Sequence, residues 1–397
     1  MTRRIAVTGV GIVCALGRDQ REFWSNTIEG RGGIGRLDLF EAPGCRSDRA
    51  AQARPDSASE RRRASRTDRF CMMAAREATA QAGLSEAELA SFGVSLGSST
   101  AGMLEAEAWS RRCFSSGFAR ARPSQVLHLP SSTPADAVAR ALGASGPRLS
   151  NMTACSSSAA SVGLAADLIR DGDARGMIAG GGDALCLMTY AGFNALRLLD
   201  AGPCRPFDAG RQGLSLGEGA GALVLEDWAG AVERGARPLA EFLEYGASCD
   251  AHHMTAPHPE GRGAAGAMAT ALARAGLQAD QVDHINAHGT GTQLNDISEA
   301  KAIREVFGAR AARIPVTSSK SQLGHLLGGS GGVEAVALVL SLMHQMIPPT
   351  LRCQIPDPDV GLDVVSGSAR AASLRIGISN SFGFGGTNYS LLFAAVS

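Results

Sequence analysis

The sequence predicts an α/β protein. Short runs rich in β-branched residues alternate with alanine-rich stretches almost from one end of the chain to the other, a pattern typical of helices packed on a sheet. Several of the alanine-rich stretches are followed by glycine, which ends a helix in the left-handed conformation at little cost. With 397 residues, 45% of them hydrophobic, the chain has enough apolar material for more than one ordinary domain.

The elements follow one another from a first strand expected at residues 4–10. The apolar run there is too short, and too rich in valine and glycine, for a secretory signal. Further strands are expected at residues 93–97, 176–180, 221–226, 282–287 and 374–379. Helices are expected at residues 69–82, 156–170, 263–275, 296–307 and 332–345, four of them closed by Gly83, Gly172, Gly276 and Gly308.

Three other segments bear on the organisation of the chain. Residues 41–66 are polar and without periodicity, which predicts a surface loop. A linker-like stretch at residues 230–238 divides the chain into halves of 1–235 and 236–397. The glycine runs at 180–182 and 328–332 do not match the spacing of nucleotide-binding loops, so we expect them to allow close backbone approach in the core.

Composition excludes several classes of function. Lys plus Arg and Asp plus Glu both number 38, so no overall field attracts the chain to nucleic acid or to an anionic membrane. The nine cysteines show neither a paired motif nor a metal-ligand spacing, which indicates a reduced, intracellular protein without a metal site. No apolar stretch approaches the ~20 residues of a membrane span, and the chain is expected to be cytoplasmic.

The segment at residues 151–158 (NMTACSSS) places a cysteine between a strand-like run and an alanine-rich helix. Cys155 therefore lies at the expected N-terminus of that helix, where the helix dipole and free backbone N–H groups favour the thiolate. A thiolate is the form that attacks a thioester. Because most cysteines are buried structural residues, this position alone leaves both interpretations open.

Two segments that contain histidine supply further chemistry. His288 follows the strand expected at residues 282–287 and precedes GTGT, whose small side chains leave room for a substrate beside the ring. His325 lies five residues after Lys320 and just before the run GGSGG. A lone histidine is often structural, but two near a thiol can stabilise negative charge that develops on a carbonyl oxygen.

Four separated motifs, TACSSS, HGTGT, the run from Lys320 to Gly332 and SFGFGGTN, occur in one order along the chain. Together they resemble the ketoacyl synthase family of type II fatty acid and polyketide synthesis. The resemblance extends over essentially the whole chain and implies a thiolase fold, with duplicated αβαβα halves in five layers and the active site where they meet. Family members are dimers, so a homodimer or a heterodimer with a chain-length factor is implied.

The resemblance also implies a reaction. Cys155 would accept an acyl group from acyl carrier protein, and malonyl carrier protein would then lose carbon dioxide and attack that group. His288 and His325 would donate hydrogen bonds to the malonyl thioester carbonyl as the enolate forms. The backbone N–H groups of Cys155 and Phe384 would form the oxyanion hole for the acyl thioester.

Two charged residues match family positions. Lys320 matches an active-site lysine that orients the histidines and water through its positive charge. Glu299 matches an acid that orders Lys320 or nearby water. The segment from Asp296 to Glu299 also reads as a helix N-cap followed by a capping-box acid, and both interpretations stay open.

The remaining implied site residues concern the acyl chain. Phe384, between two glycines, matches a gating phenylalanine, with packing in the core as the alternative. Substrate contacts are implied for Phe193, Thr290 and Thr292. Thr100 matches the floor of the acyl pocket, where a small residue would admit a longer chain, although its hydroxyl could instead satisfy a loop hydrogen bond.

Acyl carrier proteins are acidic, so cations are expected to dock them. The basic run Arg61, Arg62, Arg63, Arg66 and Arg69 is the densest in the sequence, and Arg122 and Arg197 match the family's entrance. Most charge runs are simply solvated. No bound cofactor or metal is implied, because phosphopantetheine arrives on the carrier protein.

Two other classes of protein compete with this interpretation. Chain-length factors resemble the enzyme but lack the nucleophile, whereas Cys155 and both histidines are present here. Degradative thiolases act on coenzyme A thioesters and carry a second cysteine in the C-terminal glycine-rich motif, which has none in this chain. His325 points to the elongating branch, and TACSSS with HGTGTQLND is closer to polyketide or secondary-metabolite enzymes than to housekeeping fatty acid synthesis.

Overall fold

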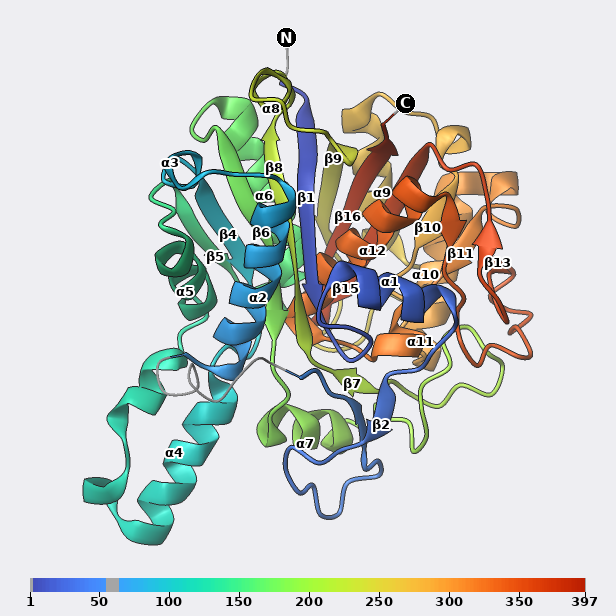
Figure 1. The fold of residues 1–397 in the computed structure, drawn as a ribbon. Coiled ribbons are helices and arrows are strands. Elements are labelled where there is room, and N and C mark those ends of the chain that lie inside the picture. Colours follow the sequence, from blue (N-terminus) through green and yellow to red (C-terminus); the bar gives the residue numbers. More distant parts are fainter. Residues whose placement is uncertain (1–2, 55–63, 397) are drawn as a thin grey trace.

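The computed structural model describes residues 3–54 and 64–396. Its main feature is an eleven-stranded mixed sheet in the order β13-β11-β10-β15-β16-β9-β1-β8-β6-β4-β5 (Figure 1). Strands of the first part of the chain are β1 (Ile5–Val13), β4 (Gly93–Gly97), β5 (Arg148–Asn151), β6 (Gly176–Asp183) and β8 (Gly219–Asp227). Strands of the second part are β9 (Ala240–Cys249), β10 (His284–Asn286), β11 (Pro315–Thr317), β13 (Asp363–Val364), β15 (Ile376–Gly383) and β16 (Thr387–Ala395).

The two parts of the sheet repeat one topology. In the first part, β4 pairs parallel with β5 and β6, and β8 runs antiparallel between β6 and β1. In the second part, β10 pairs parallel with β11 and β15, and β16 runs antiparallel between β15 and β9. The parts join where β1 pairs antiparallel with β9 through Ile5 and Phe242. The expected boundary at residue 235 falls between them, although α8 (Trp228–Glu233) occupies part of the expected linker.

Helices form three layers around the two parts of the sheet. The central helices α6 (Ser157–Asp171) and α12 (Ser330–His344) lie in the middle, and α12 contacts β6 and β8 on one side and β15 and β16 on the other. The outer helices are α2 (Arg66–Gln81) and α5 (Thr133–Leu142) on the first part, and α9 (Arg262–Ala275) and α10 (Gln293–Phe307) on the second. The expected five-layer, duplicated arrangement is therefore confirmed.

The remaining elements complete the molecule. They are α1 (Gln20–Ile28), α3 (Glu86–Leu89), α4 (Met103–Ser116), α7 (Leu187–Ala195), α11 (Lys320–Leu323), β2 (Ile34–Arg36), β3 (Arg49–Ala51), β7 (Leu216–Gly217), β12 (Met346–Ile347) and β14 (Arg370–Ala371). Short 3-10 segments are η2 (Phe118–Arg120), η3 (Pro123–His128), η4 (Ala154–Ser156), η5 (Ala279–Gln281), η6 (Gly308–Arg310), η7 (Leu327–Gly329) and η8 (Phe384–Gly386). Figure 1 shows α4 and the segment after it standing away from the sheet as an arm.

The expected strands and helices are all present, with ends shifted by a few residues. The strand predicted at 93–97 has those bounds, whereas β10 is three residues long where six were expected, at 282–287. The expected glycine ends are also found, because Gly172 and Gly276 adopt the left-handed conformation after α6 and α9.

The glycine runs lie where backbones touch, as expected. A Cβ on Gly181 would lie 2.0 Å from the carbonyl oxygen of Gly97, and one on Gly331 would lie 2.8 Å from Ala159. Because Gly331 lies in the first turn of α12 and Ala159 lies in α6, Gly331 lets the two central helices approach each other, whereas Gly181 lets β6 lie close against β4.

The apolar helix α12 corrects the expectation that no stretch of the chain approaches the length of a membrane span. Within the described residues, the segment Leu327–His344 is 18 residues long and apolar enough to cross a membrane by length and composition. However, 89% of this segment is buried inside the protein, between the two parts of the sheet. Its apolar side chains are therefore accounted for by the core.

Two of the arginines expected to dock a carrier protein are buried. The Arg66 side chain is 12% exposed, and its Nε donates to Glu218 Oε2 over 2.8 Å, while Glu218 itself is fully buried. Arg69 is 6% exposed. The docking assignment of Arg66 and Arg69 is not supported, because neither side chain is at the surface. Arg66 binds the Ala53 carbonyl as well as Glu218, and Arg69 lies against the Ser65 carbonyl at the start of α2. Arg61, Arg62 and Arg63 lie outside the described residues.

We predict that Arg66→Met lowers the free energy of unfolding by about 3–5 kcal/mol, because it leaves the Glu218 carboxylate buried without its cation. Chemical denaturation of the variant and the wild type measures the difference. Arg122→Met is the matched control, since Arg122 is exposed and should change stability by less than about 0.5 kcal/mol. A loss below about 1 kcal/mol for Arg66→Met would show that the pair is not structural.

Candidate active site

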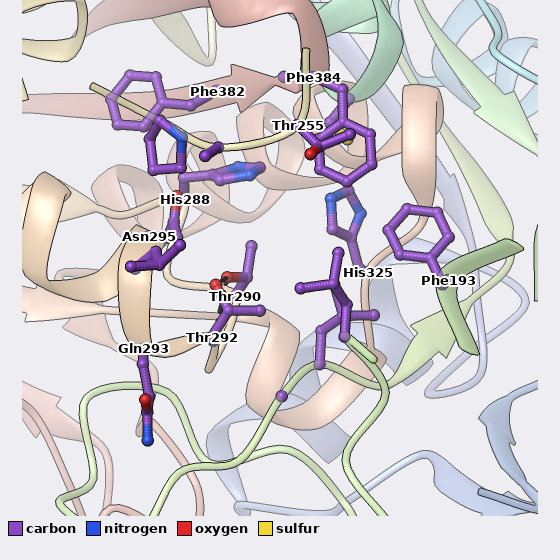
Figure 2. Close-up of a pocket in the computed structure, with 18 of the residues that line it drawn as sticks. Phe193, Thr255, His288, Thr290, Thr292, Gln293, Asn295, His325, Phe382 and Phe384 are labelled. Carbon is purple, nitrogen blue, oxygen red and sulfur yellow. Dashed lines mark hydrogen bonds between the residues drawn. The ribbon is translucent and has the colours of Figure 1, made fainter. Parts of the chain in front are cut away.

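Both parts of the chain line one cavity of about 560 Å³. Cys155 and Phe193 come from the first part, and His288, His325 and Phe384 from the second. Figure 2 shows the two histidine rings with Phe193 and Phe384 beside His325. The structure therefore brings together the expected nucleophile, both histidines and both aromatic residues.

Cys155 is held in a tight turn between β5 and α6. The preceding residue, Ala154, has a positive φ of 51°, a conformation that an L-residue adopts only when its surroundings enforce it. The turn is fixed by Ser157, whose hydroxyl donates to the Ala154 carbonyl over 2.6 Å and accepts the Thr153 N–H over 2.9 Å. Gly97 permits this turn, because a Cβ there would lie 2.2 Å from Ser157.

The environment of the Cys155 sulfur favours the thiol. Burial raises the pKa of Cys155 to about 11, although the positive charge of Lys320 and the backbone N–H of Phe384 each lower it. The expected bias towards the thiolate at a helix N-terminus is thus outweighed by burial. The backbone N–H groups of Phe384 and of Cys155 itself lie near the sulfur, and their role as an oxyanion hole for the acyl thioester stays a prediction.

The hydrogen bonds of His325 fix its tautomer. Its Nδ1 accepts the backbone N–H of Leu327 over 2.9 Å and lies 3.1 Å from the Ser330 hydroxyl. Because Nδ1 accepts a backbone N–H, the proton of the neutral ring is on Nε2. His325 therefore presents a donor to the cavity.

His288 has the same tautomer for a different reason. Its Nδ1 lies 3.3 Å from Lys320 Nζ, and an ammonium group can only donate. The ring centroids of His288 and His325 are 5.4 Å apart at 86°. Burial, followed by the charge of Lys320, holds the pKa of both histidines well below the usual 6.5, so both are neutral donors at neutral pH.

Lys320 is positioned by an acid that the sequence did not indicate. Its ammonium pairs with the Glu334 carboxylate of α12, and the two side chains are 1% and 2% exposed. Burial raises the pKa of Glu334, while Lys320 opposes this shift. A single acid within a fifteen-residue apolar helix was the available signal, because a carboxylate seldom enters such a helix without a partner.

Glu299 binds the backbone of the loop at His288, and its expected ordering of nearby water stays a prediction. Its carboxylate accepts the backbone N–H groups of His288 and Gly289, each over 2.8 Å, so it holds the histidine loop and does not contact Lys320. The capping-box alternative is wrong, because α10 begins at Gln293 with Thr292 at its cap. Burial raises the pKa of Glu299 to about 7, and the two N–H bonds lower it.

Phe384 stacks on Phe193 with ring centroids 5.5 Å apart. The following residue, Gly385, has a φ of 81° and donates its N–H to the Met254 carbonyl over 2.8 Å. The Gly386 carbonyl accepts the Asp250 N–H over 2.8 Å and the Asn388 amide over 3.0 Å. The turn is thus held on both sides of Gly385, and the role of Phe384 as a gate stays a prediction.

The threonines fall into two groups. Thr290 and Thr292 line the cavity, and their hydroxyl oxygens are 2.9 Å apart. Thr100 is not among the lining residues, and its hydroxyl donates to Asp183 Oδ1 over 2.8 Å. Within this chain Thr100 therefore has the loop hydrogen bond that was its alternative role.

The cations at the cavity differ from those expected. Arg197 lines it, as the sequence suggested, together with Arg46, which the sequence did not indicate. Both side chains are exposed. Arg122 is also exposed but begins η3 on the arm and does not line the cavity.

Comparisons with known proteins give one consistent result. The family model described as Beta-ketoacyl synthase, N-terminal domain, matches residues 2–231, and the one described as Beta-ketoacyl synthase, C-terminal domain, matches residues 239–354. The chain is 38% identical to the 3-oxoacyl-[acyl-carrier-protein] synthase 2 of Synechocystis sp., over 98% of each chain.

Solved structures agree with these matches. The ishigamide ketosynthase/chain length factor has a TM-score of 0.95 at 34% identity over 100% of both chains. AntDE:AntF, a type II acyl carrier protein in complex with its ketosynthase, has a TM-score of 0.92 at 30% identity over 100% of both chains. The thiolase fold expected from the resemblance is confirmed.

We predict that alkylation of Cys155 by iodoacetamide accelerates about tenfold per pH unit from pH 7 to 10, because the thiolate fraction grows until the pH reaches a pKa of about 11. Peptide mass spectrometry measures the rate at each pH. In the denatured chain the same peptide should level off near pH 8.5. A plateau below pH 9 in the folded protein would contradict the raised pKa.

Proposed function

The chain belongs to the beta-ketoacyl synthase family, and we propose that it condenses an acyl group held on Cys155 with malonyl-acyl carrier protein. The observation that carries this proposal is a thiol and two neutral Nε2–H histidines on one cavity. This set provides a nucleophile for a thioester and two donors for an enolate oxygen.

The first half-reaction loads the enzyme. The Cys155 sulfur attacks the carbonyl carbon of an acyl thioester, and the oxyanion accepts the N–H groups of Cys155 and Phe384. The carrier thiol then leaves with the proton that Cys155 has lost, and the acyl group remains on the enzyme as a thioester. Phe193 and Phe384 offer apolar contact to that acyl chain.

The second half-reaction forms the carbon–carbon bond. Malonyl carrier protein releases carbon dioxide, and the resulting enolate oxygen accepts the Nε2–H groups of His288 and His325. The enolate carbon attacks the acyl carbonyl, and the Cys155 sulfur leaves as a thiolate that takes a proton from solvent. The product is a β-ketoacyl group on the carrier protein. Lys320 keeps His288 in the donor tautomer through its contact with Nδ1.

Partners and pathway extend the proposal. The substrate arm is the carrier's phosphopantetheine, so the protein itself needs no bound cofactor or metal. Because the ishigamide structure is a ketosynthase/chain length factor, and Cys155 makes this chain the catalytic type, its partner is a second copy or a chain-length factor. The motifs favour polyketide or secondary-metabolite synthesis over fatty acid synthesis, in the cytoplasm.

The arm supports a subunit interface. Phe114, Phe118 and Leu127 on α4, η2 and η3 are 90%, 76% and 72% exposed in the single chain. Large apolar side chains grouped in this way usually lie in a protein interface. Molar mass in solution, with and without a co-expressed chain-length factor, tests this part of the proposal.

We predict that Cys155→Gln abolishes condensation but still releases carbon dioxide from malonyl carrier protein, because both histidine donors remain. Product mass spectrometry and carbon dioxide release measure the two steps. Cys249→Ala is the matched control, since this cysteine is exposed and does not line the cavity. Wild-type condensation by Cys155→Gln would exclude Cys155 as the nucleophile.

We further predict that Arg46→Ala and Arg197→Ala raise KM for an acyl carrier protein substrate about three- to tenfold, since each removes a cation from the entrance. KM for an acyl thioester of free pantetheine should stay unchanged. The comparison variant Arg122→Ala, on the arm, should leave both constants near wild type. Equal effects on the two substrates would mean that the arginines do not bind the carrier protein.

A further inference from the structure

A small internal cavity lies among the strands and helices that carry the catalytic residues. It has a volume of about 10 Å³ and is lined by Thr27 of α1, His284 and Asn286 of β10, Thr317 of β11, Ser319, Ser341 of α12 and several apolar residues. β10 leads to His288, β11 leads to Lys320, and α12 carries Glu334. The elements that line the small cavity therefore also carry or lead to His288, Lys320 and Glu334.

His284 is the unusual residue in this cavity. It is 1% exposed, and among the described residues neither ring nitrogen has a hydrogen-bond partner. Burial lowers the pKa of His284 to about 3, so the ring is neutral, with one N–H to donate and one nitrogen to accept. A buried polar group without a partner is costly, and such groups normally bind an internal water molecule.

Two hydroxyl groups that line the same cavity are also buried without a hydrogen-bond partner in the part of the chain that the structure describes. They are Thr27 Oγ1 and Ser319 Oγ. The cavity volume is close to the roughly 10–15 Å³ that one water molecule requires, and a buried water typically makes about three hydrogen bonds. One ring nitrogen and two hydroxyls provide that number.

The cavity is connected to the catalytic residues through Ser319. The Ser319 side chain lies near enough to the Glu334 carboxylate to lower the pKa of that carboxyl, although Ser319 Oγ and Glu334 Oε2 are both buried without a hydrogen-bond partner among the described residues. Glu334 pairs with Lys320. Lys320 in turn contacts His288 Nδ1. Direct contacts thus join Glu334, Lys320 and His288. The Ser319 hydroxyl, unpartnered among the described residues, lies between this group and the cavity at His284.

We propose that this cavity binds one water molecule between His284, Thr27 and Ser319, and that the water orients Ser319 towards Glu334. His284 and Ser319 are then positioning residues for the condensation. They act through Glu334 and Lys320 and do not touch the substrate. This role rests on the proposed function, whereas the water site itself does not.

The test compares His284→Phe, which keeps a planar aromatic ring, slightly larger, but removes both nitrogens, with Thr27→Val and Ser319→Ala. We expect kcat for condensation to fall about three- to tenfold in His284→Phe and Ser319→Ala, and less in Thr27→Val, with KM for both carrier substrates unchanged. Ser341→Ala is the matched control, because its hydroxyl lines the cavity but already donates to the Ala337 carbonyl over 3.0 Å. It should match the wild type.

A second readout needs no carrier protein. The charge of Lys320 lowers the pKa of Cys155, so a displaced Lys320 should slow alkylation of Cys155 at fixed pH, about threefold for half a pKa unit. A high-resolution crystal structure of the wild type should show the water, and that of Ser319→Ala should show whether Glu334 has moved.

The outcomes are distinct. An empty cavity in the wild-type crystal structure overturns the water site, and wild-type kcat with wild-type alkylation in His284→Phe and Ser319→Ala overturns the positioning role. If His284→Phe does not fold, Ser319→Ala and Thr27→Val decide the question. If the wild-type protein shows no condensation activity, the proposed function is refuted. The crystal structure and the rates of Cys155 alkylation would still test the water site and the positioning role.

Discussion

The buried ion pair of Lys320 and Glu334 is the interaction on which the site depends. Both side chains are almost inaccessible, so each charge would be costly without the other. Their elements, α11 and α12, follow one another in the chain and enclose His325 between them. The pair places an ammonium against His288 Nδ1 and a positive charge near Cys155. It therefore determines a histidine tautomer and contributes to the acidity of the nucleophile.

Buried carboxylates that accept backbone N–H groups organise the surrounding loops. Glu299 holds the loop at His288, and Asp183 binds the loop after β4 through the N–H groups of Ser99 and Thr100. Asp183 also accepts the N–H of Gly328, which ties the first part of the chain to the segment before α12. Such bonds to charged acceptors are stronger than neutral ones, so the catalytic loops are held by groups that never contact the substrate.

Sequence patterns predicted much of this arrangement, because strand and helix periodicity is local and each catalytic motif lies on one short segment. Partners distant in the chain could not be predicted. Arg66 belongs to a basic run that reads as solvated, and its acid, Glu218, lies 152 residues further on. Glu334 was missed for the same reason, since only packing places α12 behind Lys320. Thr100 and Glu299 were assigned by resemblance to family positions, and periodicity could not indicate their hydrogen bonds to Asp183 and to the backbone of the loop at His288.

The protonation states of His288, His325 and Cys155 determine which step each group can assist. Both histidines carry their proton on Nε2 and accept at Nδ1, so neither has a free nitrogen facing the substrate to take a proton from Cys155. The thiol, with its pKa of about 11, must therefore be activated by its surroundings: the N–H groups of Cys155 and Phe384 and the charge of Lys320 all stabilise negative charge there. Neutral donors suit the enolate, because they stabilise its oxygen without supplying a proton that would quench its carbon. The same burial that keeps the histidines neutral raises the pKa of the Cys155 thiol. In return, the neutral histidines do not protonate the carbon of the enolate before it attacks.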